Sequence, residues 1–171
     1  MKRALAFGGI AAGLALILYA LFSGETDEEQ IRRKLDDLAT TVAVEGETQN
    51  VAVRSLQLKG QFREIFEKNV TATIPELGST RSGRGDLAAL AARSTVQFEQ
   101  LGLDFDDVSV SFDGGQTNAV VKTTVVMTGI RRGQVDPRRD RRRVRLRFFK
   151  DEDHGWRIAS VKVGEAADPA E

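Results

Sequence analysis

The feature that most constrains this chain is an uninterrupted run of uncharged, mostly apolar side chains at residues 4–22. As a helix these 19 residues would extend about 28 Å, close to the hydrocarbon thickness of a bilayer. Lys2 and Arg3 precede the run, and residues 25–29 supply four acidic side chains directly after it. Positive charge before a span favours an N-terminus that stays in the cytoplasm. The pattern predicts a transmembrane signal anchor over residues 1–22.

A cleaved signal peptide is the alternative explanation for the same run. Cleavage prefers small residues at positions −3 and −1. Cleavage after Ser23 or Gly24 would place Leu21 or Phe22 at position −3, and both side chains are too large. We therefore expect a retained anchor in a bacterial inner membrane, crossing once, with a cytoplasmic N-terminus and a periplasmic domain.

Composition excludes several classes of function. The 171 residues include 25 basic and 25 acidic side chains, so net charge gives no support for a nucleic-acid partner. The absence of cysteine excludes disulfides, thiolate metal sites and cysteine nucleophiles. A single histidine, His154, excludes a histidine-rich metal site and disfavours a Ser-His-Asp triad. We expect neither a cofactor nor a metal.

Helical patterns come first in the remaining chain. Thr26 and Glu29 have the spacing of a capping box, and an apolar stripe at helical intervals follows them. Gly60 is expected to end one short helix before the next begins. Residues 78–85, rich in Gly, Ser and Arg, predict a loop. The expected helices cover residues 27–42, 51–58, 61–68 and 86–98.

Strand patterns dominate the second half. Apolar and polar residues alternate, and β-branched residues are frequent. The segment Asp113-Gly114-Gly115-Gln116 predicts a hairpin turn, because glycine adopts the positive φ that such turns need. The expected strands cover residues 70–74, 108–112, 117–130, 143–148 and 156–163.

Helices followed by an antiparallel meander indicate an α+β fold. We expect a cone-shaped domain of about three helices packed on a curved antiparallel sheet, after the N-terminal transmembrane helix. The predicted organisation is an anchor over residues 1–22, one domain over 23–163 and a flexible tail over 164–171.

This pattern resembles the nuclear transport factor 2-like (SnoaL-like) superfamily. The resemblance covers residues 26–163 and rests on three stretches: the opening helix DEEQIRRKLDDLA, the strand-to-helix passage VTATIPELGSTRSGRGDLAALAA, and the closing strands RVRLRFFKDEDHGWRIASVKV. It implies three N-terminal helices resting in a strongly bent sheet. Because this fold serves many functions, it implies little about activity.

The superfamily includes ketosteroid isomerases, dehydratases and polyketide cyclases, which use a pocket aspartate or histidine. No motif places such a residue in this chain. Non-catalytic relatives include an inner-membrane assembly factor of type IV secretion systems, whose layout of one span and a periplasmic domain is similar. The resemblance also implies a possible homodimer.

An arginine cluster is the most informative feature of the domain. Between residues 131 and 147 there are nine arginines and two aspartates, a local net charge of +7. Arg143, Arg145 and Arg147 alternate with apolar residues and should share one sheet face. Three explanations stay open: a solvated face paired with acids from other strands, a site for anionic lipid or another polyanion, or docking of an acidic protein. Arg131 and Arg132 begin the cluster and are further candidates.

A small-ligand site inside the cone is the alternative function. Phe62, Phe66, Val110, Phe148 and Trp156 could line it, although any core of this fold needs such residues. An isomerase or cyclase would also require a carboxylate of raised pKa.

Single residues that could do chemistry have plainer explanations. Asp86 opens a helix and suits its dipole. His154 lies in a charged hairpin turn and should be exposed. Residues 104–107 and 151–153 lack the ligand spacing of a calcium loop. We therefore predict no catalytic residue and no metal ligand, and favour a non-enzymatic, membrane-anchored envelope domain that binds a partner protein or an anionic surface.

Overall fold

The computed structural model describes residues 24–46, 50–75 and 78–166. Within these ranges the helices are α2 (Asp27–Val42), α3 (Val51–Ile65) and α4 (Arg84–Gln97). The strands are β1 (Val44–Glu45), β2 (Phe66–Ile74), β3 (Ser79–Ser82), β4 (Phe98–Phe112), β5 (Asn118–Arg131), β6 (Arg138–Asp151) and β7 (Gly155–Ala166).

None of the helices in the described ranges is both long and apolar enough to cross a membrane. The span predicted over residues 4–22 lies outside those ranges.

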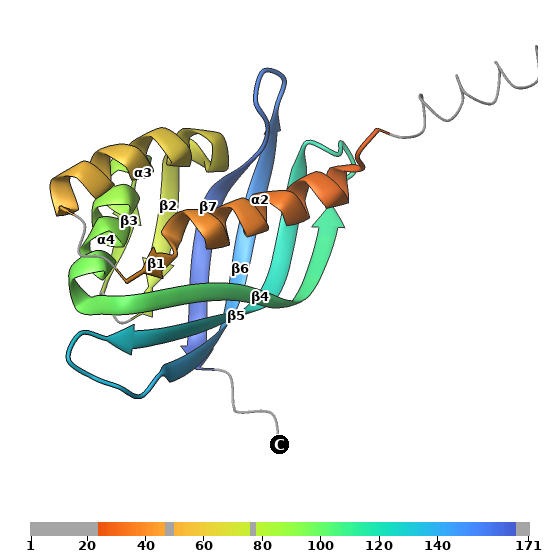
Figure 1. Ribbon diagram of the computed structural model, residues 1–171. Coiled ribbons are helices and arrows are strands. Elements are labelled where there is room, and N and C mark those ends of the chain that lie inside the picture. Colours follow the sequence, from red (N-terminus) through yellow and green to blue (C-terminus); the bar gives the residue numbers. More distant parts are fainter. Residues whose placement is uncertain (1–23, 47–49, 76–77, 167–171) are drawn as a thin grey trace, which may run out of the picture.

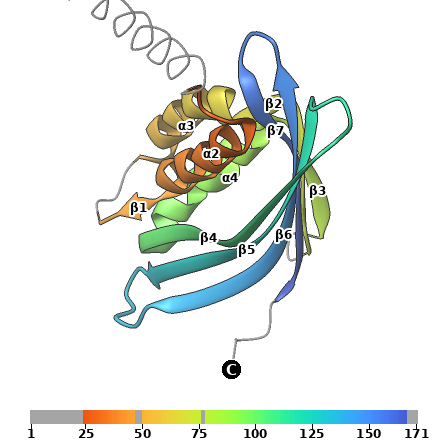
Figure 2. The same cartoon turned by 90° about the vertical axis from the view of Figure 1, so that its right-hand side faces the viewer.

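The strands form one curved sheet in the order β1-β4-β5-β6-β7-β2-β3. The three helices cover one face, α2 lying across the strands and α3 beside α4 (Figure 1). Seen from the side, the sheet bends around the helices, and none of the described helices lies on its other face (Figure 2). We call these the inner and the outer face. The expected α+β architecture is confirmed.

The sheet is mixed, which corrects the expectation of a purely antiparallel one. Strand β2 pairs in parallel with β7, with Thr71 opposite Ser160 and Thr73 opposite Lys162. The other pairings are antiparallel. Alternation along a strand reports which face each residue occupies, but it carries no information on the direction of a neighbouring strand.

Helix α2 matches its predicted signals. The Thr26 hydroxyl accepts the Glu29 N–H at 3.3 Å, and the Glu29 carboxylate accepts the Thr26 N–H at 2.7 Å. Helix α3 differs from the expectation, because it passes through Gly60 without a break. Asn50 caps it by accepting from the N–H groups of Ala52 and Val53. Glycine lowers helix stability by only about 1 kcal/mol relative to alanine, which packing can offset.

Several strand boundaries also differ from the predicted ones. Strand β3 occupies part of the expected 78–85 loop, and β4 begins at Phe98, well before the predicted 108. Pairing with neighbouring strands overrides the weak β-propensity of these Gly-, Ser- and Asp-containing segments. Strand β7 continues through Ala166, beyond the predicted boundary at 163. The turn after β4 forms as expected, but Gln116 rather than a glycine has the positive φ, 53°.

The core lies between the helices and the inner face. Its largest fully buried side chains include Trp156, Phe148, Ile31, Leu35 and Leu58. Rows of inner-face residues continue across the sheet, for example Val121–Leu146–Val161. Even-numbered residues of β6 therefore point inward, and the odd-numbered arginines point outward.

Two polar clusters hold the edges of this core. Asp27, in the first turn of α2, accepts hydrogen bonds from Lys150 Nζ at 2.7 Å and from the buried Trp156 Nε1 at 3.0 Å. At the seam between β2 and β7, the buried Arg157 lies 2.7 Å from Glu67 Oε1 and 2.5 Å from Asp151 Oδ2. The Glu67 contact is a close ion pair without hydrogen-bond alignment.

Candidate functional site

The arginine cluster divides into two parts with different surroundings. Arg132 donates from Nε and Nη2 to the Thr95 carbonyl, at 3.2 and 3.0 Å, near the C-terminal end of α4. The Arg131 guanidinium lies 6.0 Å from the centre of the Phe98 ring. These two arginines therefore fasten the start of β4 and the end of α4 to the end of β5, which is a structural role.

Arg143, Arg145 and Arg147 lie together on the outer face, where all three are exposed. Lys122 on β5 and Lys162 on β7 flank the middle arginine, because Arg145 is the register partner of both. Sequence reasoning missed these two lysines. Each is the only lysine of its strand, and only the register of three strands brings them into one row with Arg145.

We call Lys122, Arg143, Arg145, Arg147 and Lys162 the outer-face cations. Neighbouring strands are about 4.8 Å apart, so the row of three cations brings like charges directly opposite one another. Such pairs destabilise a sheet unless an anion compensates them. Among the described residues, the β6 arginines that form ion pairs are other ones: Arg141 pairs with Asp106 at 3.3 Å and Arg142 with Asp140 at 3.1 Å.

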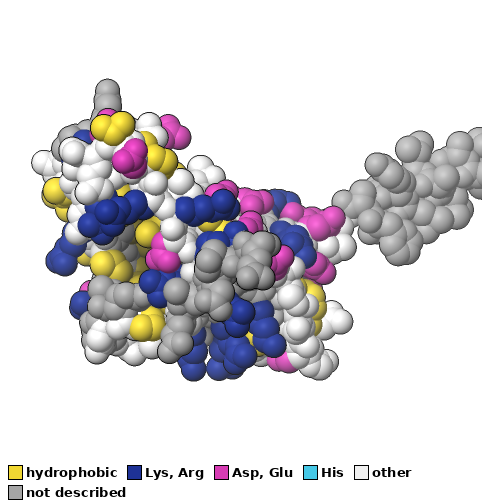
Figure 3. Space-filling model, turned by 90° about the horizontal axis from the view of Figure 1, so that it is seen from below, with side chains coloured by type: hydrophobic (Ala, Val, Ile, Leu, Met, Phe, Trp, Pro, Cys, Tyr) yellow, Lys and Arg dark blue, Asp and Glu magenta, His cyan; other side chains and the backbone are white. Residues whose placement is uncertain are grey.

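One explanation for the arginine face was that acids from other strands neutralise it, and the contacts of the outer-face cations can be compared with that expectation. No side-chain hydrogen bond or ion pair of an outer-face cation is found among the described residues. The face is therefore a concentration of positive charge open to solvent. In Figure 3 dark-blue Lys and Arg side chains gather along the lower edge of the molecule.

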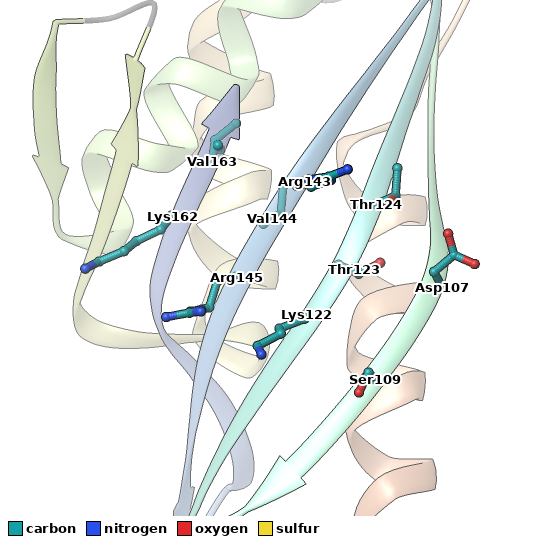
Figure 4. Close-up of a pocket in the computed structure, with 11 residues that line it drawn as sticks. Asp107, Ser109, Lys122, Thr123, Thr124, Arg143, Val144, Arg145, Lys162 and Val163 are labelled. Carbon is teal, nitrogen blue, oxygen red and sulfur yellow. The ribbon is translucent and has the colours of Figure 1, made fainter. Parts of the chain in front are cut away.

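A hollow of about 480 Å³ opens among these cations. Lys122, Arg145 and Lys162 lie side by side on adjacent strands in it, and Arg143 lies farther along β6 (Figure 4). Hydroxyl-bearing Ser109 and Thr124 add hydrogen-bonding groups to the lining. Its one acid, Asp107, stands in a bulge of β4 with a φ of 54°. Cations and hydroxyls in one hollow suit an anionic ligand with several oxygen atoms.

A second hollow, of about 250 Å³, lies inside the cone between the helices and the inner face. Every residue in its lining is Ala, Val, Leu, Ile or Phe. Such a lining can hold an apolar group, but it contains no acid, base or hydrogen-bonding side chain. The described residues around this cavity therefore offer no group for proton transfer.

The structure places the predicted pocket residues in two environments. Phe62 and Phe66 line the cavity, and their rings make an edge contact with centres 4.8 Å apart. Phe148 and Trp156 are fully buried core residues outside the lining. Val110 packs against that core. The apolar pattern identified buried positions but could not separate core from cavity wall.

The remaining single-residue candidates lie away from both hollows. Asp86 is exposed in the first turn of α4. His154 is exposed, and its Nδ1 lies 3.2 Å from Asp151 Oδ1. Asp151, Asp153 and His154 form a group with ligand atoms within 4.8 Å of one another. However, Asp151 Oδ1 already accepts two backbone N–H groups and its Oδ2 binds Arg157, which explains this group as a turn.

Comparison with solved structures identifies the architecture. Over 84% of this chain and 94% of the other, a nuclear transport factor 2-like superfamily protein from Salmonella enterica serovar Typhimurium superposes with a TM-score of 0.65 at 15% identity. The fold is that of nuclear transport factor 2-like proteins. The predicted resemblance in fold is thereby confirmed, and the membrane-anchored nature of the chain stays a prediction.

Two structures from Novosphingobium aromaticivorans are also similar. A nuclear transport factor 2-like protein with a cystatin-like fold has a TM-score of 0.61 at 16% identity, covering 99% of this chain and 94% of that one. A provisionally assigned scytalone dehydratase has a TM-score of 0.61 at 12% identity, covering 82% and 86%. No protein-family model and no curated protein matches the chain. At these identities the similarity establishes the fold alone.

Proposed function

We propose that this chain is a non-enzymatic binding domain, held at the periplasmic side of a bacterial inner membrane by residues 4–22, whose outer face binds an anionic partner. The observation that carries the proposal is the set of five exposed outer-face cations without an acidic partner among the described residues. Their mutual repulsion costs stability in the free domain, and an anion would relieve it.

The energetics suit a partner of high charge. Each Lys or Arg near an anionic surface contributes about 1 kcal/mol at physiological ionic strength. Five cations can therefore contribute several kcal/mol, which is sufficient for reversible association. Binding of this kind should weaken steeply as salt rises, because salt screens exposed charges.

The test compares two variants of β6 in co-sedimentation with vesicles that contain or lack anionic lipid, and in binding to polyglutamate. Substituting Arg145→Ser and Arg147→Ser should reduce binding strongly. The control, Arg138→Ser with Arg139→Ser, removes the same charge from exposed positions on the same strand. Unchanged binding in the first variant, or equal loss in both, would contradict the assigned face.

The predicted anchor needs its own measurement. Alkaline carbonate extraction of membranes should leave the full-length chain in the pellet, and its N-terminus should be intact. A mature chain that begins near Gly24 and is released by extraction would overturn the anchored part of the proposal, leaving the outer-face site in place.

A homodimer is not expected to form by direct packing of two outer faces. Two copies meeting through their outer faces would bring ten cations together, which like-charge repulsion disfavours unless a polyanion lies between them. The homodimer implied by the family resemblance therefore stays a prediction. Light scattering with and without a polyanion would test it.

A second candidate function, binding of a small apolar ligand, rests on the cone cavity. Its volume of about 250 Å³ and hydrocarbon lining fit a compact apolar molecule. Residues 24–171 in detergent-free buffer should bind naphthalene, and Ala91→Phe should abolish binding by filling the space beside α4. Retained binding in this variant would exclude the cavity as the site.

A further inference from the structure

The cation-lined hollow of about 480 Å³ continues along the outer face. A hollow of about 280 Å³ shares Arg145 and Lys162 with it, and adds Arg147 and Ser160. A third outer-face hollow, of about 520 Å³, shares Arg147 and Ser160 with the 280 Å³ hollow and reaches Asn69 and Phe149. The shared residues join the three into one elongated depression, which we call the outer-face groove.

We propose that the outer-face groove binds an extended acidic peptide segment with carboxylates at alternate residues. The proposal rests on the proposed anionic function and specifies its partner. It commits to a polypeptide rather than to a lipid surface or an inorganic polyanion.

The spacing of the arginines supports this assignment. Arg143, Arg145 and Arg147 are two residues apart on β6, so successive guanidinium-bearing side chains emerge about 6.8 Å apart on the same face. An extended peptide presents its own same-side residues at the same interval. Three carboxylates at positions i, i+2 and i+4 therefore match three arginines one to one. Guanidinium and carboxylate groups pair in a planar, two-bond geometry that favours arginine.

The composition of the groove favours a peptide over a uniform polyanion. Phe149 is 42% exposed at one end, and Val120 lies in the middle section. Asn69 and Ser160 can both donate and accept hydrogen bonds, as a peptide backbone requires. Asp107 at the other end could accept a hydrogen bond from a peptide backbone N–H, a donor that a polyphosphate lacks. Glu67, a further acid in the third hollow, is already paired with Arg157.

The experiment measures fluorescence anisotropy with the full-length chain in a nonionic detergent. Two labelled peptides carry the same four glutamates: one repeats Glu-Thr, and the other repeats Glu-Thr-Thr. In an extended chain the first presents all its carboxylates on one side, whereas the second alternates them between sides. The alternate-residue peptide should bind about fivefold more tightly or better, since only it can engage the arginines together.

Substituted chains locate the peptide. Arg145→Ser with Arg147→Ser should weaken binding of the alternate-residue peptide about tenfold or more, as expected when paired charges are removed. The control, Arg138→Ser with Arg139→Ser, should remain within about twofold of the unmodified chain. Circular dichroism of both variants checks that the fold is kept.

The outcomes separate this inference from the proposed function. Equal affinity for the two peptides would overturn the peptide assignment, although an anion site would remain. Binding of anionic vesicles or long-chain polyphosphate in the absence of peptide binding would also overturn it and would identify a different anionic partner. Failure to bind any of these anions would refute both the inference and the proposed function.

Discussion

The contact between Asp27 and the closing hairpin yields a sharp prediction about stability. Asp27 Oδ1 accepts from both Lys150 Nζ and the Trp156 indole N–H. Asp27→Asn keeps an oxygen that can accept from the indole but loses the charge pair. Asp27→Ala loses both partners. The two substitutions should therefore differ in their effect on the free energy of unfolding.

The structure sets the size of that difference. The Lys150 side chain is 39% exposed, so its ion pair contributes only about 0.5–1 kcal/mol. Loss of the favourable interaction with the α2 dipole brings the cost of Asp27→Asn to about 1 kcal/mol. Trp156 is 1% exposed, and a buried N–H without an acceptor costs a further 1–3 kcal/mol or so. We expect Asp27→Ala to cost about 3 kcal/mol.

Urea unfolding of residues 24–171 provides the assay. Trp156 is the only tryptophan, so its fluorescence reports directly on this corner of the fold, and circular dichroism supplies an independent probe. Asp36→Asn, at an exposed position of the same helix, is the control and should change stability by less than about 0.5 kcal/mol. If Asp27→Ala costs no more than Asp27→Asn, the indole bond does not contribute as argued.

The same contact predicts a pH dependence. Hydrogen bonds from Lys150 and then from Trp156 lower the pKa of Asp27 below its usual value of 3.8. A carboxylate with a lowered folded-state pKa stabilises the protein fully above the unfolded pKa, and this contribution is lost as pH falls through the folded value. The stability gap between the unmodified chain and Asp27→Asn should therefore be constant near neutral pH and shrink below about pH 4. A gap that persists at pH 2 would contradict the assignment.

Three further substitutions test other contacts by the same unfolding measurement. Arg157→Met leaves the carboxylates of Glu67 and Asp151 near each other without a counter-charge, and should cost about 2–3 kcal/mol. An unchanged free energy of unfolding would show that the Arg157 ion pairs add nothing to stability. Gly129→Val should cost about 1–3 kcal/mol, because a Cβ there would lie 2.9 Å from Phe98 Cδ1; Gly102→Val, where the nearest such contact is 3.9 Å, is the milder control. Thr26→Ala should cost about 1 kcal/mol by removing the capping box, whereas an unchanged unfolding midpoint would argue that the cap is dispensable.

The sequence predicted local features well where the signal is local. The α2 cap, its buried stripe of Ile31, Leu35 and Leu38, and the outward direction of Arg143 follow from spacing alone. It failed where distant segments decide the outcome. The early start of β4 depends on pairing with β5, and the parallel pairing of β2 with β7 depends on topology.

In the candidate site too, local spacing was predicted correctly and contacts between distant segments were not. Arginine spacing on β6 identified three of the five outer-face cations, but Arg131 and Arg132 contact Phe98 and the end of α4 instead. Nothing in the local sequence distinguishes these two from Arg143, Arg145 and Arg147, because their partners come from other elements. The cavity wall was likewise predicted only in part, since periodicity reports burial and not the empty space that packing leaves.

By itself, the sequence determined that helices dominate the first half of the domain and strands the second, which side chains of a strand share a face, and the concentration of arginine in one strand, because backbone periodicity is a property of neighbouring residues. Only the tertiary structure decided that Lys122 and Lys162 flank Arg145 and that no described acid forms an ion pair with them. Register between strands sets those distances, and charge acts through distance in space rather than through separation along the chain.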